Sequence, residues 1–251
     1  MEALIVGNRP LESNIIELSK DKLVVAADAG ADRLLKYNIN PDYVIGDLDS
    51  ISDKATTKLE EWIVSNKNIQ KTDLEKAVDY AFEKGAKRIQ IVGWSGGRID
   101  HTLAALGLAF NPKISLIDEN FTIKAVNDSE ILKGEEKTLF SLMAMPEARV
   151  SVTGARWNLK HEKLEMSGRG VHNEIGESGE VTIECHSGNL LLIEGNFVLP
   201  HECFSISETR IVIKAEPRSA DKNTSKLARP NSLTGFVRYP IPVSKSEVIV
   251  P

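Results

Sequence analysis

The sequence predicts an α/β fold in its N-terminal part and an all-β fold in its C-terminal part. Up to about residue 118, short runs rich in β-branched residues alternate with amphipathic stretches of helical period, the pattern of βαβ units. Beyond residue 120 the helical stretches stop, and short strand-like runs follow one another between Gly, Asn and Ser turns. Hydrophobic residues make up 41% of the chain and charged residues 27%, as in ordinary globular proteins.

The N-terminal part is predicted to contain a parallel, Rossmann-like sheet with helices between its strands. The expected strands are Ala3–Val6, Leu23–Ala27, Tyr43–Ile45, a weak run at Ile69–Gln70, Arg88–Val92 and Ile114–Ile117. The expected helices are Leu11–Ser19, Ala31–Tyr37, Ser52–Val64, Leu74–Lys84 and His101–Phe110. Ser52 and Asp53 can cap one of these helices, and Thr72 or Asp73 another, by accepting hydrogen bonds from free backbone N–H groups.

The C-terminal part is predicted to be a β-sandwich followed by a tail. Its expected strands are Phe121–Val126, Lys137–Leu142, Arg149–Thr153, Val181–Cys185, Asn189–Ile193 and Arg210–Ile213. We therefore expect an α/β domain over residues 1–120 and a β-sandwich domain over residues 121–215. Over residues 216–251 the periodicity is lost and five of the ten prolines occur, so an extended or disordered tail is expected there.

Charge, cysteine content and hydropathy argue against several classes of protein. The net charge of −5 argues against nucleic-acid binding through a basic surface. Cys185 and Cys203 form neither a disulfide framework nor a metal-binding spacing. The first residues lack the pattern of a signal peptide, and no apolar run approaches the roughly 18–20 residues that cross a bilayer. We expect a cytoplasmic protein that binds neither nucleic acid nor membrane.

Four polar clusters follow expected strands at points where a helix is about to begin. They are Asp28, Asp47–Ser50, Thr72–Asp73 and Gly96–His101. In an open α/β sheet the carboxyl ends of the strands form the edge where ligands bind, so several carboxylates are expected to converge there. Converging carboxylates repel one another unless a cation compensates, and oxygen-only ligands favour Mg²⁺, which is commonly bound together with substrate phosphates. The sequence therefore predicts a Mg²⁺-dependent enzyme that acts on a nucleotide.

Residues near these clusters fit phosphate chemistry or have simpler interpretations. Gly96–Gly97 lets backbone N–H groups approach a phosphate, and Arg98 offers a planar guanidinium. His101 lies in the first turn of an apolar helix and fits a supporting role, while Asp32 and Arg33 can pair on a helix surface. The chain has no Gly-x-x-x-x-Gly-Lys-Ser/Thr loop and no Gly-x-Gly-x-x-Gly after its first strand, which argues against P-loop kinases and dinucleotide oxidoreductases.

Taken together, these residues resemble the thiamine pyrophosphokinase family. The matching segments lie in the family's order at Ala27–Leu34, Pro41–Ile51, Thr72–Ala77, Gly96–His101, Thr153–Leu159 and Val171–Glu174. The resemblance covers about residues 3–195, and its most specific part is the block Pro41–Ser50. It implies a homodimer with thiamine bound between the subunits. It also implies transfer of the pyrophosphoryl group of ATP to thiamine, which yields thiamine diphosphate and AMP.

The resemblance also implies roles for individual residues. Asp47, Asp49 and Asp73 would hold Mg²⁺ on the ATP phosphates. Asp100 joins them as a catalytic residue, and Asp73 or Asp100 would act as general base. The implied nucleotide-binding residues are Asp28, Arg33, Thr72, Arg98 and His101. The implied thiamine-binding residues are Trp157, which would stack on the pyrimidine from the partner subunit, His172 and Asn173.

Three other functions stay open at this point. A pyrophosphokinase for another primary alcohol, such as a hydroxymethylpterin, would use the same catalytic part. A non-catalytic thiamine or nucleotide sensor is the second, because Gln70 stands where the family commonly has aspartate and His172 where it usually has serine. A metal-dependent glycosyltransferase built on Asp47 and Asp49 is the third, and the other acidic loops disfavour it. The resemblance gives no account of residues 196–251.

Overall fold

The computed structural model describes residues 1–11 and 14–195. The chain divides into two units, Met1–Pro200 and His201–Pro251, and all described residues belong to the first. The predicted strand Arg210–Ile213, the predicted tail over residues 216–251 and Cys203 lie outside the described residues.

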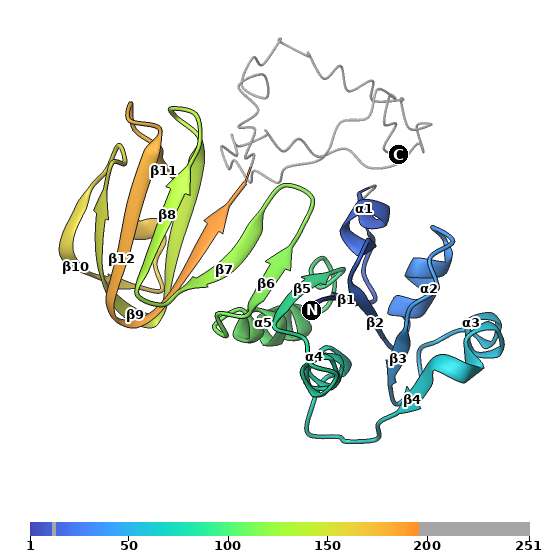
Figure 1. The fold of residues 1–251 in the computed structure, drawn as a ribbon. Coiled ribbons are helices and arrows are strands. Elements are labelled where there is room, and N and C mark those ends of the chain that lie inside the picture. Colours follow the sequence, from blue (N-terminus) through green and yellow to red (C-terminus); the bar gives the residue numbers. More distant parts are fainter. Residues whose placement is uncertain (12–13, 196–251) are drawn as a thin grey trace, which may run out of the picture. The chain divides into compact units, whose positions relative to one another are not determined.

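The N-terminal half is a sheet of parallel strands with helices between them (Figure 1). Its strands are β1 (Glu2–Val6), β2 (Leu23–Ala27), β3 (Tyr43–Gly46), β4 (Ile63–Ser65), β5 (Arg88–Val92) and β6 (Ile114–Ile117). Its helices are α1 (Ile15–Ser19), α2 (Gly30–Leu35), α3 (Asp53–Lys58), α4 (Asp73–Glu83) and α5 (Ile99–Leu108), with a 3₁₀ turn at Glu60–Trp62. The spatial order is β6-β5-β1-β2-β3-β4, and every neighbouring pair in this series is parallel.

Both faces of this sheet are buried at β1 and β2, which explains why these two strands are almost continuously apolar rather than alternating. Alternate residues of β1 enter different clusters: Ala3 and Ile5 pack in the cluster that contains α4 and α5 residues, and Leu4 and Val6 in the one that contains α1 and α2 residues. All four are fully buried. The helices therefore cover both faces and leave the strand ends as the accessible edge.

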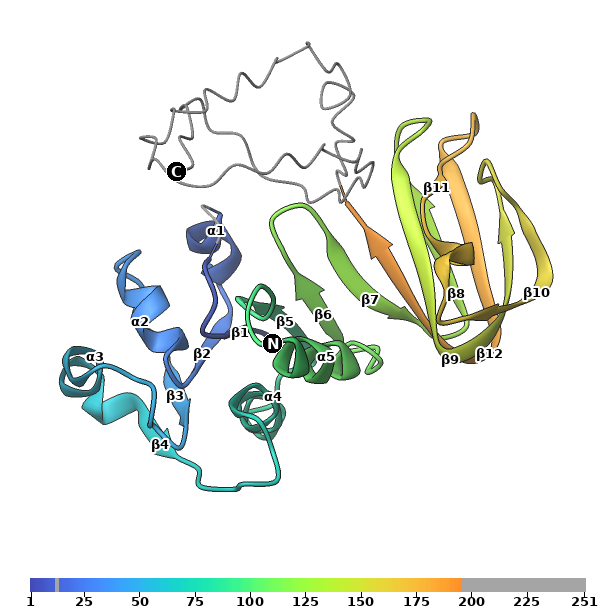
Figure 2. The ribbon, with the colours of Figure 1, turned by 180° about the vertical axis from the view of Figure 1, so that it is seen from behind.

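The C-terminal half continues the sheet with antiparallel strands (Figure 2). Its strands are β7 (Thr122–Val126), β8 (Ser129–Lys133), β9 (Leu139–Thr153), β10 (Leu159–Glu165), β11 (Asn173–Glu174) and β12 (Glu180–Glu194), with a 3₁₀ turn at Gly168–Gly170. β7 pairs antiparallel with β6 across the turn closed by Asp118 N–H and the Phe121 carbonyl, 2.9 Å apart. A separate core, which includes Phe140, Val150 and Ile183, fills this half.

An N-terminal α/β part and a C-terminal β part are thus observed, as the sequence predicts. The narrower descriptions, a Rossmann-like domain and a sandwich domain divided at residue 120, stay predictions. Among the described helices, none combines the length and apolarity needed to span a bilayer.

The stretch between α3 and α4 differs from the prediction. The predicted helix Ser52–Val64 ends at Lys58, and the predicted strand Ile69–Gln70 is absent. The edge strand is instead β4, because Ile63 and Val64 pair with β3 and are partly buried, whereas Ile69 is 98% exposed. Burial against a neighbouring strand outweighed local helical period here.

Two long strands replace pairs of short ones in the C-terminal half. Lys137–Leu142 and Arg149–Thr153 were expected separately but belong largely to β9, and Val181–Cys185 and Asn189–Ile193 both belong to β12. β9 and β12 pair with each other over almost their whole length, with register shifts at Cys185–Ser187 and Gly188–Leu190. Strands β8, β10 and β11 were not predicted, since their exposed polar residues mask the apolar alternation.

Gly30 tests how tightly α2 packs on the sheet. A Cβ at this position would lie 2.0 Å from the Val6 carbonyl oxygen, so Gly30→Ala is expected to lower the free energy of unfolding by about 2 kcal/mol or more. Gly107 in α5 is the matched control, because a Cβ there meets nothing within 4 Å. Gly107→Ala should raise stability by up to about 1 kcal/mol through helix propensity. Urea unfolding of both variants measures the difference; equal effects would contradict this packing.

Candidate active site

Two of the predicted carboxylates follow adjacent parallel strands. Asp28 follows β2 and Asp47 follows β3, so both side chains emerge at the same edge of the sheet. The Asp28 backbone N–H donates to the Ile45 carbonyl at 2.8 Å and its φ is +47°, which turns the chain sharply after the strand. Its side chain is only 5% exposed. Local backbone geometry therefore directs a carboxylate into a nearly dry position.

Asp73 reaches the same place from the first turn of α4. Thr72 caps this helix: its hydroxyl accepts from Glu75 N–H at 3.3 Å, and Glu75 accepts from Thr72 N–H at 2.7 Å. This capping box fixes where α4 begins and hence where Asp73 lies. Thr72, expected among the nucleotide-binding residues, therefore has a defined role in shaping the site.

The structure brings Asp28, Asp47 and Asp73 together. Each offers a carboxylate oxygen within 4.8 Å of the others. Gly46 leaves the room that this requires, because a Cβ at residue 46 would lie 3.0 Å from the Asp28 Cβ and 3.3 Å from Asp73 Oδ1. Within the described part of the chain, Asp28 Oδ1 is buried and has no hydrogen-bond partner. We call these three residues the carboxylate cluster.

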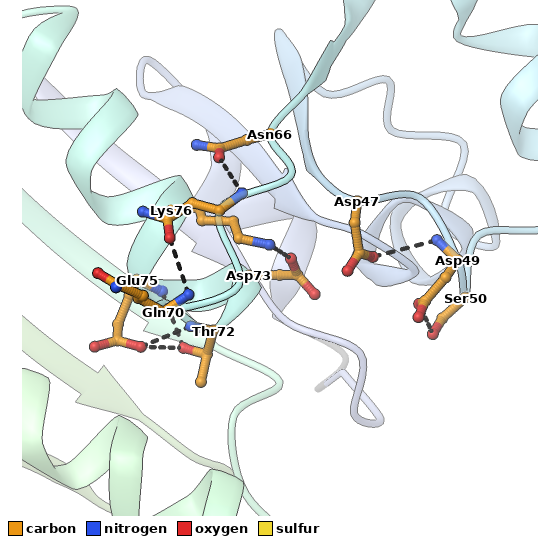
Figure 3. Close-up of polar contacts among 10 residues, drawn as sticks. Asp47, Asp49, Ser50, Asn66, Gln70, Thr72, Asp73, Glu75 and Lys76 are labelled. Atoms are coloured by element: carbon orange, nitrogen blue, oxygen red, sulfur yellow. Dashed lines mark hydrogen bonds and ion pairs between the residues drawn. The ribbon is translucent and has the colours of Figure 1, made fainter.

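Electrostatic repulsion in the carboxylate cluster is strong and only partly compensated. Burial raises the pKa of the Asp28 carboxyl above its ordinary value, and the charge of Asp73 raises it further. Lys76 is 4% exposed and its ammonium lies 2.8 Å from Asp73 Oδ1, one turn along α4 (Figure 3). One buried ammonium facing three carboxylates leaves the cluster with excess negative charge.

Asp49, predicted as a metal ligand, lies beside the carboxylate cluster and not in it. Its N–H donates to Asp47 Oδ1 at 3.4 Å, and its own Oδ1 accepts from the Ser50 hydroxyl at 2.7 Å (Figure 3). Its charge still contributes to raising the pKa of Asp28. Asp28, predicted to bind the nucleotide, takes the third position in the cluster.

Arg98 and Asp100 form a paired unit before and within the first turn of α5. The guanidinium donates to both carboxylate oxygens, at 3.1 and 2.6 Å, and both side chains are exposed. Hydrogen bonding from Arg98 lowers the pKa of Asp100 to about 2. His101 is also exposed, and its backbone N–H donates to Asp100 Oδ1 at 3.0 Å.

The predicted surface pair between Asp32 and Arg33 does not form. Arg33 donates to the side-chain and main-chain oxygens of Asn8, each at 3.3 Å. Asp32 accepts instead from the backbone N–H of Ser52 at 3.0 Å and from its hydroxyl. Adjacent residues on a helix point in different directions, so Arg33 binds Asn8 and Asp32 binds Ser52 in the neighbouring loops.

The three predicted thiamine-binding residues line one cavity in the C-terminal half. Trp157, His172 and Asn173 border a cavity of about 320 Å³ together with Leu142, Leu159 and Arg169–Val171. The Trp157 side chain is 49% exposed, and the Arg156 guanidinium lies 4.5 Å from its ring centre. An apolar, half-open cavity with an aromatic wall suits a flat heteroaromatic ligand.

The Asn173 side chain forms hydrogen bonds with the backbone of Trp157. Its Oδ1 accepts from the N–H groups of Trp157 at 3.2 Å and Glu174 at 2.9 Å, and its Nδ2 donates to the Trp157 carbonyl at 2.8 Å. At 8% exposure it holds the tryptophan in place. His172 has φ of +69°, and its N–H donates to the Ser141 hydroxyl at 3.0 Å.

Sequence reasoning missed Gly46 and Lys76 as parts of the site. Gly46 lies in the matching segment Pro41–Ile51 but was given no role of its own, although a glycine directly before an acidic loop is a signal for close side-chain approach. Lys76 follows Asp73 by three residues, a spacing that places both on one helix face. Gln70 is exposed and lies outside the carboxylate cluster.

Two family models match the chain. The model described as "Thiamin pyrophosphokinase, catalytic domain" matches residues 16–119, and the one described as "Thiamin pyrophosphokinase, vitamin B1 binding domain" matches residues 128–190. Together they cover well over half of the sequence.

Curated relatives and solved structures agree with these matches. The thiamine pyrophosphokinase of Bacillus subtilis (strain 168) is 33% identical over 185 residues, which are 68% of this chain and 86% of that protein. Thiamine pyrophosphokinase 1 of Oryza sativa subsp. japonica is 27% identical over 202 residues, 66% of this chain and 76% of that protein. The crystal structure of thiamine pyrophosphokinase from Bacillus subtilis has a TM-score of 0.68 at 27% identity and covers 78% of this chain and 99% of that one.

Lys76 should be the main internal compensation for Asp73. Lys76→Met removes a nearly buried ammonium and leaves the carboxylates facing one another, so the free energy of unfolding should fall by about 1–3 kcal/mol in the absence of divalent cations. Adding Asp73→Asn should recover part of this loss. Urea unfolding of the two single variants and the double variant gives the coupling. Strictly additive effects would show that the pair contributes nothing.

Proposed function

Because the chain belongs to the thiamin pyrophosphokinase family, we propose that its carboxylate cluster holds the Mg²⁺ of an ATP-dependent transfer to thiamine. The reaction moves the pyrophosphoryl group of ATP to the thiamine hydroxyl and yields thiamine diphosphate and AMP. The observation that carries the metal assignment is the convergence of Asp28, Asp47 and Asp73 at one strand edge. A pterin pyrophosphokinase and a glycosyltransferase lack support of this kind.

The residues present fit Mg²⁺. The donor set contains oxygen atoms alone, and one of them, Asp28 Oδ1, is buried without a hydrogen-bond partner in the described structure. Because Gly46 has no Cβ, one oxygen of each carboxylate can lie within 4.8 Å of an oxygen of the other two. When bound, Mg²⁺ neutralises charge on the phosphate oxygens of ATP and holds them in one orientation. Asp49 is proposed to assist from its adjacent position.

Lys76 and Arg98 supply the protein's own positive charge. Lys76 keeps Asp73 oriented through its 2.8 Å ion pair, so this carboxylate needs no rearrangement to bind a cation. Arg98 uses two N–H groups on Asp100 and keeps others for a phosphate. Transfers of this type depend mainly on such positioning and charge neutralisation.

The pKa of Asp100 argues against a general-base role for this residue. A carboxyl with a pKa of about 2 is a weak proton acceptor near neutral pH. We propose that Asp100 instead orients the Arg98 guanidinium, and that His101 and Arg33 support the loops around the nucleotide. Of the two general bases that the sequence predicts, Asp73 or Asp100, we therefore propose Asp73.

Thiamine is proposed to bind in the cavity beside Trp157. The exposed indole offers a stacking face for the thiamine pyrimidine, and His172 and Asn173 shape the cavity around it. A cavity open to solvent on the C-terminal half fits a site completed by the partner subunit of a homodimer. Residues 1–120 would then bind ATP and Mg²⁺, and residues 121–215 would bind thiamine and form the dimer. A cytoplasmic location also stays a prediction.

AMP release tests the function directly. The purified protein with ATP and Mg²⁺ is expected to release AMP only when thiamine is present, with thiamine diphosphate identified by mass. AMP release with a hydroxymethylpterin and not with thiamine would show that the protein is a pyrophosphokinase for another alcohol. Thiamine binding without any AMP release would indicate a sensor.

Asp28→Asn tests whether Mg²⁺ is held by the carboxylate cluster, which includes Asp28, or by the predicted set, which has Asp49 in its place. This change replaces one carboxylate oxygen by NH2 and removes the negative charge of Asp28. It should raise the Mg²⁺ concentration for half-maximal activity at least tenfold, because a charged ligand is lost. Asp49→Asn is the matched comparison and should have a smaller effect on the same Mg²⁺ titration, since Asp49 lies outside the cluster. A larger effect of Asp49→Asn would support the ligands predicted from the sequence, Asp47, Asp49 and Asp73, and contradict Asp28.

Trp157→Ala tests the thiamine cavity. Loss of the stacking face should lower kcat/KM for thiamine about tenfold or more and leave KM for ATP unchanged. Trp157→Phe should retain most of the activity. Trp62→Ala, which removes an indole 37% exposed in the 3₁₀ turn before β4, serves as the control. A lower apparent kcat with both KM values unchanged would show that Trp157 acts on folding alone.

A further inference from the structure

Two histidines outside the sites described above lie next to each other on the sheet of the C-terminal half. His161 belongs to β10 and His186 to β12, and β9 lies between these two strands (Figure 2). The centres of the two imidazole rings are 4.5 Å apart, and the ring planes are tilted by 40°. Neither histidine lines the cavity beside Trp157. The fold thus brings together two side chains that commonly bind metal ions.

Both histidines lie in irregularities of strand pairing that flank the same part of β9. The register between β10 and β9 shifts between Leu159 and Glu162, and the register between β12 and β9 shifts between Cys185 and Ser187. Such a bulge changes the direction of a side chain, and His161 has φ of +53°, in the left-handed region. Two strands separated by a third lie about 9–10 Å apart. The two irregularities therefore allow the imidazoles to approach across β9.

Ser151 on β9 contacts both histidines. Its hydroxyl oxygen accepts from the His161 backbone N–H at 3.1 Å and lies 2.7 Å from His186 Nε2. The first bond satisfies an N–H group that the bulge removes from the regular ladder. The second fixes the orientation of the His186 ring. When Nε2 carries the proton and donates to Ser151, Nδ1 of His186 keeps a free lone pair, which is the usual arrangement of a metal-binding histidine.

The remaining ring nitrogens are accessible to a ligand. Neither the His161 ring nor His186 Nδ1 forms a hydrogen bond with the residues that the structure describes, and both histidines are exposed. Charges of both signs lie nearby. The Arg149 guanidinium donates to the His161 carbonyl at 3.4 Å, and Glu184 pairs with Ser151 in the strand register. The carboxylate of Glu184 offsets the positive charge of Arg149, which alone would oppose the binding of a cation.

Two imidazoles in this arrangement suit a late first-row divalent ion. Imidazole nitrogen is a good ligand for Zn²⁺, Cu²⁺ and Ni²⁺, whereas Mg²⁺ prefers oxygen. Two nitrogens bound to one tetrahedral Zn²⁺ at about 2.0–2.1 Å lie roughly 3.4 Å from each other. Rings with centres 4.5 Å apart can offer two nitrogens at that separation after small rotations of the side chains. The ligand chemistry therefore differs from that of the carboxylate cluster.

We propose that His161 and His186 bind a transition-metal ion of the Zn²⁺ or Cu²⁺ type, with Ser151 orienting His186 and water completing the coordination. The ion links β10 to β12 across β9 and stabilises the two register shifts. This site is separate from the proposed transfer reaction, because its ligands are imidazoles and neither of them belongs to the carboxylate cluster or to the cavity beside Trp157.

Metal titration of the full chain, purified without a histidine tag, tests this site. Excess Mg²⁺ is present throughout to occupy the carboxylate cluster. Zn²⁺ binding is followed by calorimetry, and Cu²⁺ binding by electron paramagnetic resonance. The unmodified protein should bind one equivalent of either ion, and the Cu²⁺ spectrum should show hyperfine coupling to two imidazole nitrogens. His161→Gln and His186→Gln should each weaken Zn²⁺ binding more than tenfold, and Ser151→Ala about tenfold.

His101→Gln is the matched control, because it removes an exposed imidazole on α5, and it should bind Zn²⁺ as tightly as the unmodified protein. Zn²⁺ should also raise the Tm of the unmodified protein and leave that of His161→Gln unchanged. Equal Zn²⁺ affinity in all variants would overturn the site. A Cu²⁺ spectrum with one nitrogen or with oxygen ligands alone would overturn it too, and this spectrum of the unmodified protein decides the matter even where a variant does not fold.

Discussion

The site depends on the enforced closeness of three carboxylates at the ends of two adjacent parallel strands. β2 and β3 deliver Asp28 and Asp47 to one edge, the capping box of α4 delivers Asp73, and Gly46 leaves the space between them. Repulsion and burial oppose this arrangement, and Lys76 offsets only part of the charge. The protein therefore maintains a region of unfavourable electrostatic energy that the proposed cation would relieve, with the surrounding core supplying the stability.

Sequence reasoning located the edge of the sheet where the carboxylates converge, but not which aspartates form the carboxylate cluster. Polar residues directly after buried strands are a useful signal, because parallel strands share one carboxyl edge, and Asp28 and Asp47 both carried it. Asp73 was assigned to the same edge through the predicted strand Ile69–Gln70, which the structure does not contain, and it reaches the edge from the first turn of α4 instead. The choice between Asp28 and Asp49 depends on the turn after β2, where φ is +47°, and on the space over Gly46. Neither property is encoded in spacing alone.

The fold was predictable where burial is two-sided and less so where it is one-sided. The strands Leu23–Ala27 and Arg88–Val92 in the middle of the parallel sheet were placed correctly to the residue. In the C-terminal half, β9 and β12 contain Pro, Gly and charged residues that resemble turns in the sequence. Their pairing with each other and with β7, β8 and β10 keeps them extended. Tertiary hydrogen bonding decided these elements, and a single sequence does not display it.

Asn173 has a consequence for how the Trp157 cavity selects its occupant. Its Oδ1 accepts from the N–H groups of Trp157 and Glu174 and one Nδ2–H donates to the Trp157 carbonyl, so most of its hydrogen-bonding capacity is used inside the protein. In the proposed thiamine site, Asn173 would therefore contribute mainly shape. Selection by shape and stacking rejects a misfitting ring but tolerates an exchanged polar substituent, so the proposed site would admit analogues that keep the outline of the natural ring and alter its polar groups.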